Sequence, residues 1–139
     1  MTAPREARFP RSSSLKLRKL LRPLFRRGGS QTVAAGCVRL LFRRVSRAET
    51  AAPVQVAFVP GRQPNSVTRN RVRRALREVY RVHQGGLVDL FALPERGALT
   101  VAVLFRSVVD ADLHARVAAD MPRALERLVK ALRAEDSHN

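Results

Sequence analysis

The spacing of apolar residues marks two segments of the chain as amphipathic helices. One covers residues 15–25, where Pro23 predicts a kink and the glycine pair at 28–29 supplies a stop signal. The other follows Asp110, a candidate N-cap, and contains Pro122, which again predicts a kink. Its core-facing stripe consists of Leu113, Val117, Met121, Leu125, Leu128 and Leu132.

Three other segments have the pattern of β-strands. Residues 37–45 and 54–59 are predicted strands with a turn between them, and the second alternates between a more and a less apolar side. Residues 98–105 (ALTVAVLF) are apolar on both faces, as a central strand requires. Residues 87–93 fit either a short strand or the apolar packing of a loop.

A strongly basic segment, residues 62–78 (RQPNSVTRNRVRRALRE), contains six arginines and two asparagines and still has an apolar face. Treated as a helix over residues 66–82, with about 100° per residue, it gathers its apolar side chains on one arc. These are Val72, Ala75, Leu76, Val79, Tyr80 and Val82. The other side carries an i, i+4 row of Arg69, Arg73, Arg77 and Arg81, with Asn70 and Arg74 beside it. One face can therefore pack on a core while the other presents guanidinium groups, which suit a sugar–phosphate backbone.

The plain alternative is that this helix only exposes a solvated surface. Solvated faces usually mix charges of both signs. Between residues 69 and 81 this helix has six arginines and a single acid, Glu78. Like charges spaced i, i+4 cost roughly a few tenths of a kcal/mol for each pair, and a polyanion would relieve that repulsion. We therefore favour nucleic-acid binding.

The predicted order is helix, two strands, helix, strand, helix, which indicates an α/β sandwich with helices packed on a small sheet. A length of 139 residues, 45% of them hydrophobic, is enough for one domain with a core. We expect a mobile basic tail over residues 1–11, a single RNA-binding domain over residues 12–134 and a polar C-terminal tail over residues 135–139.

Composition adds a strong charge. The formal net charge is +16, so the chain should attract polyanions in a salt-dependent way. Only three of its 27 basic residues are lysine, and arginine favours the planar contacts of RNA recognition. No apolar run approaches the roughly 20 residues that span a bilayer. Cys37 is the single cysteine and excludes an intramolecular disulfide, which fits a reducing, cytoplasmic compartment.

The polypeptide shows no catalytic constellation of its own. Its acids are dispersed, and no pair has a spacing that argues for acid–base chemistry. His83, His114 and His138 lie far apart in the sequence, without a cysteine or carboxylate cluster, so we expect no metal site. Phosphate-binding loops and nucleophile motifs are also missing. We therefore expect a partner to carry the chemistry.

Residues 65–78 (NSVTRNRVRRALRE) closely resemble the RNR signature of the bacterial ribonuclease P protein subunit. The resemblance extends over about residues 13–132 through the order of the elements. It implies an α+β sandwich, a small mixed sheet with packed helices in an αβββαβα-like order. It also implies a left-handed βαβ crossover, in a fold shared with one domain of a ribosomal protein.

The same resemblance implies site residues. Those expected to bind the catalytic RNA are Arg62, Asn65, Arg69, Asn70, Arg71, Arg73, Arg74 and Arg77. A cleft beside the N-terminal helix would bind the 5′ leader of precursor tRNA, with Phe25 as one aromatic of the cleft. A second aromatic of the family is replaced by Leu21, and a strand aromatic is replaced by Arg39 or Leu40. Ordinary core packing is the competing reading of Leu21 and Phe25.

We therefore expect a subunit of an endoribonuclease that matures the 5′ end of tRNA. The resemblance implies a catalytic RNA partner that holds Mg²⁺ and performs the chemistry, so the protein would have no catalytic residues, cofactor or obligate protein partner. A structural RNA-binding protein, such as a ribosomal protein, is the alternative. A third possibility is an anionic membrane surface bound through residues 5–27, which the proline at position 23 disfavours.

Overall fold

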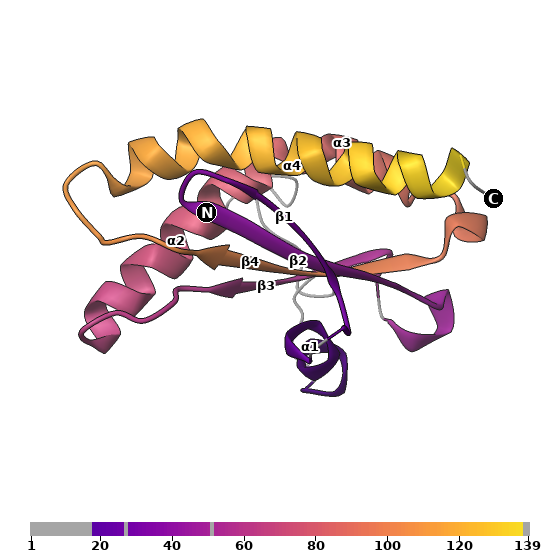
Figure 1. The fold of residues 1–139 in the computed structure, drawn as a ribbon, viewed down its shortest axis with the longest axis horizontal. Helices are drawn as coiled ribbons and strands as arrows, with labels where there is room; N and C mark the ends of the chain where they lie inside the picture. The colour runs from indigo at the N-terminus through magenta and orange to yellow at the C-terminus, as the bar shows by residue number, and fades with distance from the viewer. Residues whose placement is uncertain (1–17, 27, 51, 138–139) are drawn as a thin grey trace, which may run out of the picture.

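The computed structural model describes residues 18–26, 28–50 and 52–137, with the side chains of residues 18–21 excluded. A mixed four-stranded sheet in the order β1-β2-β4-β3 forms its centre (Figure 1). The strands are β1 (Gln31–Ala35), β2 (Val38–Val45), β3 (Val54–Val59) and β4 (Ala98–Phe105). The α+β class and the mixed sheet confirm the predicted fold class.

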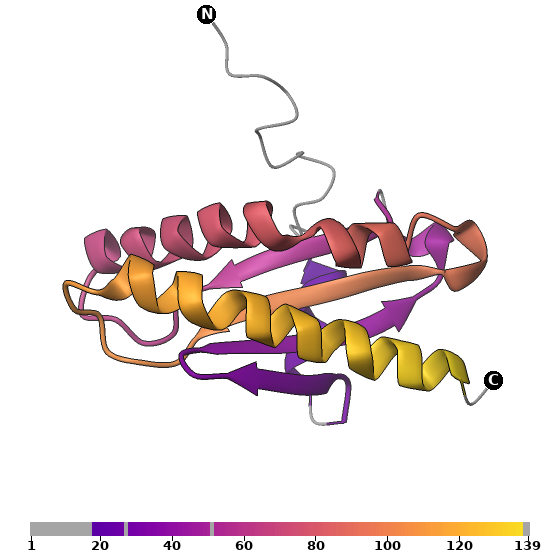
Figure 2. The same cartoon turned by 90° about the horizontal axis from the view of Figure 1, so that it is seen from above.

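Helices lie on both faces of this sheet. Figure 1 shows α2 (Ser66–His83), α3 (Gly85–Leu90) and α4 (Leu113–Ser137) on one side and α1 (Arg18–Phe25) on the other. Seen from above, α2 and α4 run beside each other across the strands (Figure 2). Within the described ranges, one face of the sheet is therefore well covered, and a single short helix covers the other.

Strand β4 is central, as its apolar sequence predicts. It pairs antiparallel with β2, with Phe42 opposite Val101, and parallel with β3, with Val56 opposite the same residue. Parallel neighbours need a crossover connection, and α2 and α3 provide it between β3 and β4. This βαβ unit places the basic helix α2 on the same face of the sheet as α4 (Figure 1). The left-handed crossover stays a prediction.

The main core lies between the sheet and the helices α2 and α4. Alternate residues of the strands point into it, including Leu40 and Phe42 of β2 and Val101 and Val103 of β4. All six predicted residues of the α4 stripe are buried. The helix continues through Pro122 to Ser137, so Pro122 neither ends nor divides it, and the kink expected there stays a prediction.

The opposite face of the sheet has a small apolar cluster of its own. Leu24 of α1 is buried against Leu41 of β2 and Ala102 of β4. Three partly buried side chains surround this contact: Ala57, Val59 and Leu104. Burying one leucine and its neighbours stabilises the fold by only about 2–3 kcal/mol, so α1 is held by a few contacts. The helix continues through Pro23 to Phe25.

Four local expectations need correction. Strand β1 has no apolar alternation that predicts it, since Gln31 and Thr32 are exposed. Residues 87–93 are neither strand nor simple loop, because α3 begins at Gly85 and buries Leu87 and Leu90. Val82 is exposed rather than buried. Asp110 is not the direct cap of α4.

The start of α4 is fixed by a turn and by a contact with the β1–β2 hairpin. Asp110 accepts the Asp112 N–H at 2.9 Å, so it closes the turn before the helix instead of serving as the direct cap. Farther along, Asp120 accepts the backbone N–H of Cys37 at 2.9 Å. Burial, together with this carboxylate, raises the pKa of Cys37 to about 11 and keeps the thiol neutral. Gly36 leaves room for Asp120, because a Cβ there would meet the carboxylate.

Candidate nucleic-acid interface

The basic helix α2 begins where the sequence predicts. The Asn65 side chain accepts the Thr68 N–H at 2.9 Å and caps the first turn. In the loop before it, Gly61 has φ +73°, and a Cβ there would lie 2.6 Å from the Phe105 carbonyl oxygen. A side chain at position 61 is therefore excluded on two grounds, and Arg62, which is exposed, is the basic residue that this loop presents.

The apolar arc of α2 faces the core. Five of its six predicted members are buried: Val72, Ala75, Leu76, Val79 and Tyr80. Burial raises the pKa of Tyr80, so its hydroxyl stays protonated. Since this face is fixed to the sheet and to α4, the remaining side chains of the helix must point outward or sideways. Asn70, Arg71, Arg74 and Arg77 are exposed, whereas Arg69 and Arg73 are half-buried.

One flank of the helix lies along the edge strand β3. The Arg77 guanidinium carbon lies 5.8 Å from the centre of the Phe58 ring, and that ring meets Tyr80 edge to face with centres 5.6 Å apart. Such a cation–π contact orients the guanidinium and leaves its N–H groups available. Arg73 donates to the Asn70 side chain at 3.1 Å. The predicted row of arginines is therefore partly pre-ordered.

The other flank faces the beginning of α4. A hollow of about 240 Å³ separates the two helices there and is lined by Arg71, Arg74, Ala75, Glu78, Ala111, Leu113 and His114. Glu78 and His114 approach to 3.7 Å between Oε2 and Nε2. Arg71 thus lies on the opposite flank from Arg77, and the basic surface of α2 wraps around the helix instead of forming one row.

The arginines of α2 are not consumed by internal ion pairs. Among the described residues, no carboxylate lies within 4.0 Å of any guanidinium from Arg69 to Arg81. Elsewhere in the same part of the chain, Arg44, Arg96, Arg116 and Arg123 all have acidic partners. The charge of α2 is therefore available to an external anion.

The opposite face of the sheet contains the residues predicted for the leader cleft. Phe25 is 49% exposed at the end of α1, so core packing is the wrong interpretation of this residue. Strand alternation also decides between two candidates, because Leu40 is fully buried in the main core and Arg39 is exposed on the α1 side. The side chain of Leu21 lies outside the described residues. The neighbouring Arg43 is exposed on the same side of β2 as Arg39.

This combination of a capped, arginine-bearing crossover helix and an α1-covered sheet face agrees with a comparison against family models. The Ribonuclease P model matches residues 9–129. The chain belongs to the ribonuclease P family. Comparison with curated proteins and with solved structures returns no match. Membership in this family confirms the resemblance found in the RNR segment and connects the chain to tRNA processing.

Two features of this ribonuclease P family protein escaped the sequence-based prediction. Phe58 lies below Arg77, and His114 lies opposite Arg71, Arg74 and Glu78. Both depend on packing between elements that are distant in the sequence. An aromatic in the strand before the basic helix was a visible signal for the first. No periodicity pointed to the second, because His114 and Glu78 are 36 positions apart.

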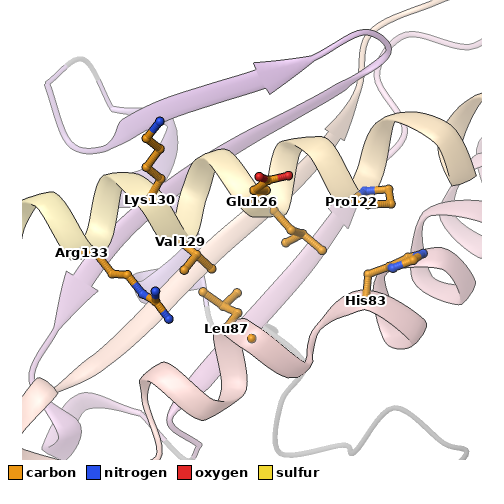
Figure 3. Close-up of a pocket in the computed structure, with 9 residues that line it drawn as sticks. His83, Leu87, Pro122, Glu126, Val129, Lys130 and Arg133 are labelled. Atoms are coloured by element: carbon orange, nitrogen blue, oxygen red, sulfur yellow. The ribbon is translucent and has the colours of Figure 1, made fainter.

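Another hollow of this ribonuclease P family protein lies away from the arginine-bearing half of α2. It measures about 610 Å³ and lies between α4 and the α2–α3 junction (Figure 3). Leu87 and Val129 point toward each other across it, with His83 toward one end and Arg133 toward the other. Within the described ranges there is no group of three His, Cys, Asp or Glu that could hold a metal ion. No described helix is long and apolar enough to cross a membrane.

Proposed function

We propose that this protein is the protein subunit of a ribonuclease P holoenzyme that removes the 5′ leader of precursor tRNA. In this proposal α2 binds the catalytic RNA, and the face beside α1 binds the leader. The RNA subunit holds Mg²⁺ and performs the hydrolysis. The protein supplies positively charged groups that reduce the repulsion between two polyanions.

The observation that carries the proposal is the state of the α2 arginines. Six of them lie on a helix whose apolar side is fixed in the core, and no described carboxylate neutralises them. Family membership implies an RNA subunit as the partner. Guanidinium groups held on a rigid element lose little entropy when they bind phosphates. The proposed RNA ligands are Arg62, Asn65, Arg69, Asn70, Arg71, Arg73, Arg74 and Arg77.

The leader site is proposed on the opposite face of the sheet. There Phe25 offers an exposed ring, and Arg39 lies on the neighbouring β2. A base can stack on the phenylalanine, which is worth about 1–3 kcal/mol per base. The guanidinium of Arg39 can contact a phosphate or stack on a second base. With fewer aromatics than the family pattern, this cleft depends more on arginine.

Reconstitution tests the function. The purified chain is mixed with a transcript of a bacterial ribonuclease P RNA and a precursor tRNA labelled at its 5′ end. We expect release of the intact leader at low Mg²⁺ only when protein and RNA are both present. No stimulation by the protein at any Mg²⁺ concentration would contradict the proposal, as would co-purification from cells with ribosomal particles instead of ribonuclease P RNA.

A further inference from the structure

We propose that the hollow between α2 and the first turn of α4 binds one RNA phosphate, and that His114 acts as a proton-dependent ligand of that phosphate. The inference rests on the proposed function, because it assumes that α2 meets RNA. It adds a binding residue that lies 36 positions after the last residue of the RNR segment. It also adds a pH dependence to RNA binding.

The shape and donors of the hollow fit a phosphate. Arg71 and Arg74 line it from α2, and both are exposed without a carboxylate partner among the described residues. His114 lines it from α4. Two guanidinium groups and an imidazole offer donors from two sides to the oxygens of one phosphate. Because both helices are fixed to one core through Ala75 and Leu113, the donors need little rearrangement.

His114 differs from the arginines because its charge depends on pH. From α2 it faces Arg71, Arg74 and Glu78, whose Oε2 lies 3.7 Å from the Nε2 of His114. From its own side, the turn before α4 carries Asp110 and Asp112. Asp110 is already paired with Arg116 at 3.2 Å. Before RNA binds, the imidazole therefore lies between charges of both signs.

A phosphate in the hollow changes this balance. It places a negative charge beside the imidazole and neutralises the field of Arg71 and Arg74, so the protonated ring becomes favoured. Protonation and RNA binding are then linked, and each strengthens the other. RNA affinity should therefore rise as the pH falls through the range in which histidine titrates. The protonated His114 then no longer depends on Glu78 as its anionic partner.

The experiment compares two histidine variants. H114Q removes the titrating ligand and keeps a polar side chain. H83Q is the matched control, because His83 is also an exposed histidine and lies at the end of α2. It is twelve residues, about 18 Å along the helix axis, from Arg71. Its side chain lines the other hollow (Figure 3). Binding of ribonuclease P RNA is measured at pH 6 and pH 8, at equal ionic strength and over a KCl series.

We expect wild type and H83Q to bind at least about threefold more tightly at pH 6 than at pH 8, as one linked proton allows. H114Q should lose most of this difference. At pH 6 the salt dependence of H114Q should also be shallower by about one phosphate contact. If H114Q retains the pH difference and the salt slope of wild type, the proposal is wrong. The same holds if H83Q removes the difference.

A second measurement separates the phosphate group from the rest of the RNA. Inorganic phosphate is added at pH 6, and the imidazole NMR signals, assigned with the two variants, are followed. Phosphate should shift the signal of His114 and leave that of His83 in place. If neither phosphate nor RNA shifts the His114 signal more than the His83 signal, there is no such site. Failure of the proposed function has a different signature, since wild type would then not bind ribonuclease P RNA at either pH.

Discussion

Two groups of arginines in this chain have opposite surroundings. On α2, the guanidinium groups from Arg69 to Arg81 have no described carboxylate within 4.0 Å. At the far end of α4, Arg44 lies 2.8 Å from Asp136 and 3.3 Å from Glu135, and its guanidinium also lies over the Phe91 ring at 5.3 Å. Arg96 shares Asp136 at 3.1 Å. The α2 group is available to an external ligand, whereas the group around Arg44 connects β2, the turn before β4 and the end of α4.

This difference shows that the positions of the acids distinguish the two roles. The chain has 27 basic residues and only 11 acids, so the acids are too few to give each arginine a carboxylate of its own. The acids near α4 and its preceding turn pair with Arg44, Arg96, Arg116 and Arg123. On α2 the single acid, Glu78, lies near His114, and the arginines of that helix have no carboxylate within 4.0 Å among the described residues. A basic helix whose arginines have no acidic partner is a better indicator of a nucleic-acid surface than the number of arginines alone.

The largest expected effect comes from removing the flank of α2 beside β3. We expect the triple variant R69A/R73A/R77A to bind ribonuclease P RNA about 100-fold more weakly at moderate salt, with a slope against log salt that is shallower by about two to three. Its melting temperature should change little, because these side chains have no described acidic partner. Filter binding over a KCl series and circular dichroism give the two quantities.

The control for this variant removes the same charge elsewhere. Arg123, Lys130 and Arg133 are exposed on α4, and replacing all three with alanine also lowers the net charge by three. If that variant loses as much RNA affinity as the α2 variant, then total charge and not the α2 surface controls binding.

The second prediction concerns the structural group. Arg44→Ala should lower the free energy of unfolding by about 2 kcal/mol, because Glu135 loses its cationic partner, Asp136 keeps only Arg96, and the contact with Phe91 is lost. RNA affinity of the folded protein should stay within about twofold of wild type. Urea titration measures the first quantity. The adjacent Arg43 is exposed and has no acidic partner among the described residues, so Arg43→Ala should cost less than about 0.5 kcal/mol. Equal losses of stability in Arg44→Ala and Arg43→Ala would contradict the structural role given to Arg44.

A smaller effect is expected on the opposite face of the sheet. The double variant F25A/R39A should weaken holoenzyme binding of precursor tRNA by about fivefold or more, as loss of a stacked base implies. Binding of mature tRNA, which has no leader, should not change. Val108→Ala provides the control, since this exposed apolar side chain lies outside the cleft. Equal effects on precursor and mature tRNA would rule out a leader site here.

The smallest effect separates two roles of Asn65, which is both a predicted RNA ligand and the observed cap of α2. Asn65→Ala should cost about 1 kcal/mol of stability, and Asn65→Ser should restore most of it because serine also caps. If Asn65 serves only as the cap, RNA affinity will follow stability in both variants. A loss of affinity that serine does not restore would indicate a direct contact with RNA.

Much of the fold follows from local patterns in the sequence. The α4 stripe was correct at all six positions, because a helix packed along its whole length on one sheet must show that spacing. Helix α2 begins at Ser66, as the predicted range of residues 66–82 requires, and the cap formed by Asn65 became clear only in the structure. Strand β4 was recognised as central because only a strand with neighbours on both edges and layers on both faces is apolar throughout.

The features that the sequence did not predict depend on tertiary contacts. Strand β1 is held by pairing with β2 at the sheet edge, and its Gln31 and Thr32 are exposed. A glycine pair such as that at 85–86 is typical of a helix end, yet α3 begins there and buries Leu87 and Leu90. The hollow at His114 exists only because the crossover brings α2 beside α4. The periodicity of apolar residues describes one segment at a time and gives no distance between separate segments.

The central position of β4 has a consequence for the order of synthesis. Strand β3 pairs with β4 and with no other described strand, yet residues 98–105 emerge from the ribosome only after the whole arginine-rich helix has been made. Until then the helix has no completed sheet to support it. A translation product truncated before β4 would therefore contain the arginine-rich sequence without the complete sheet that supports it, and would bind polyanions non-specifically.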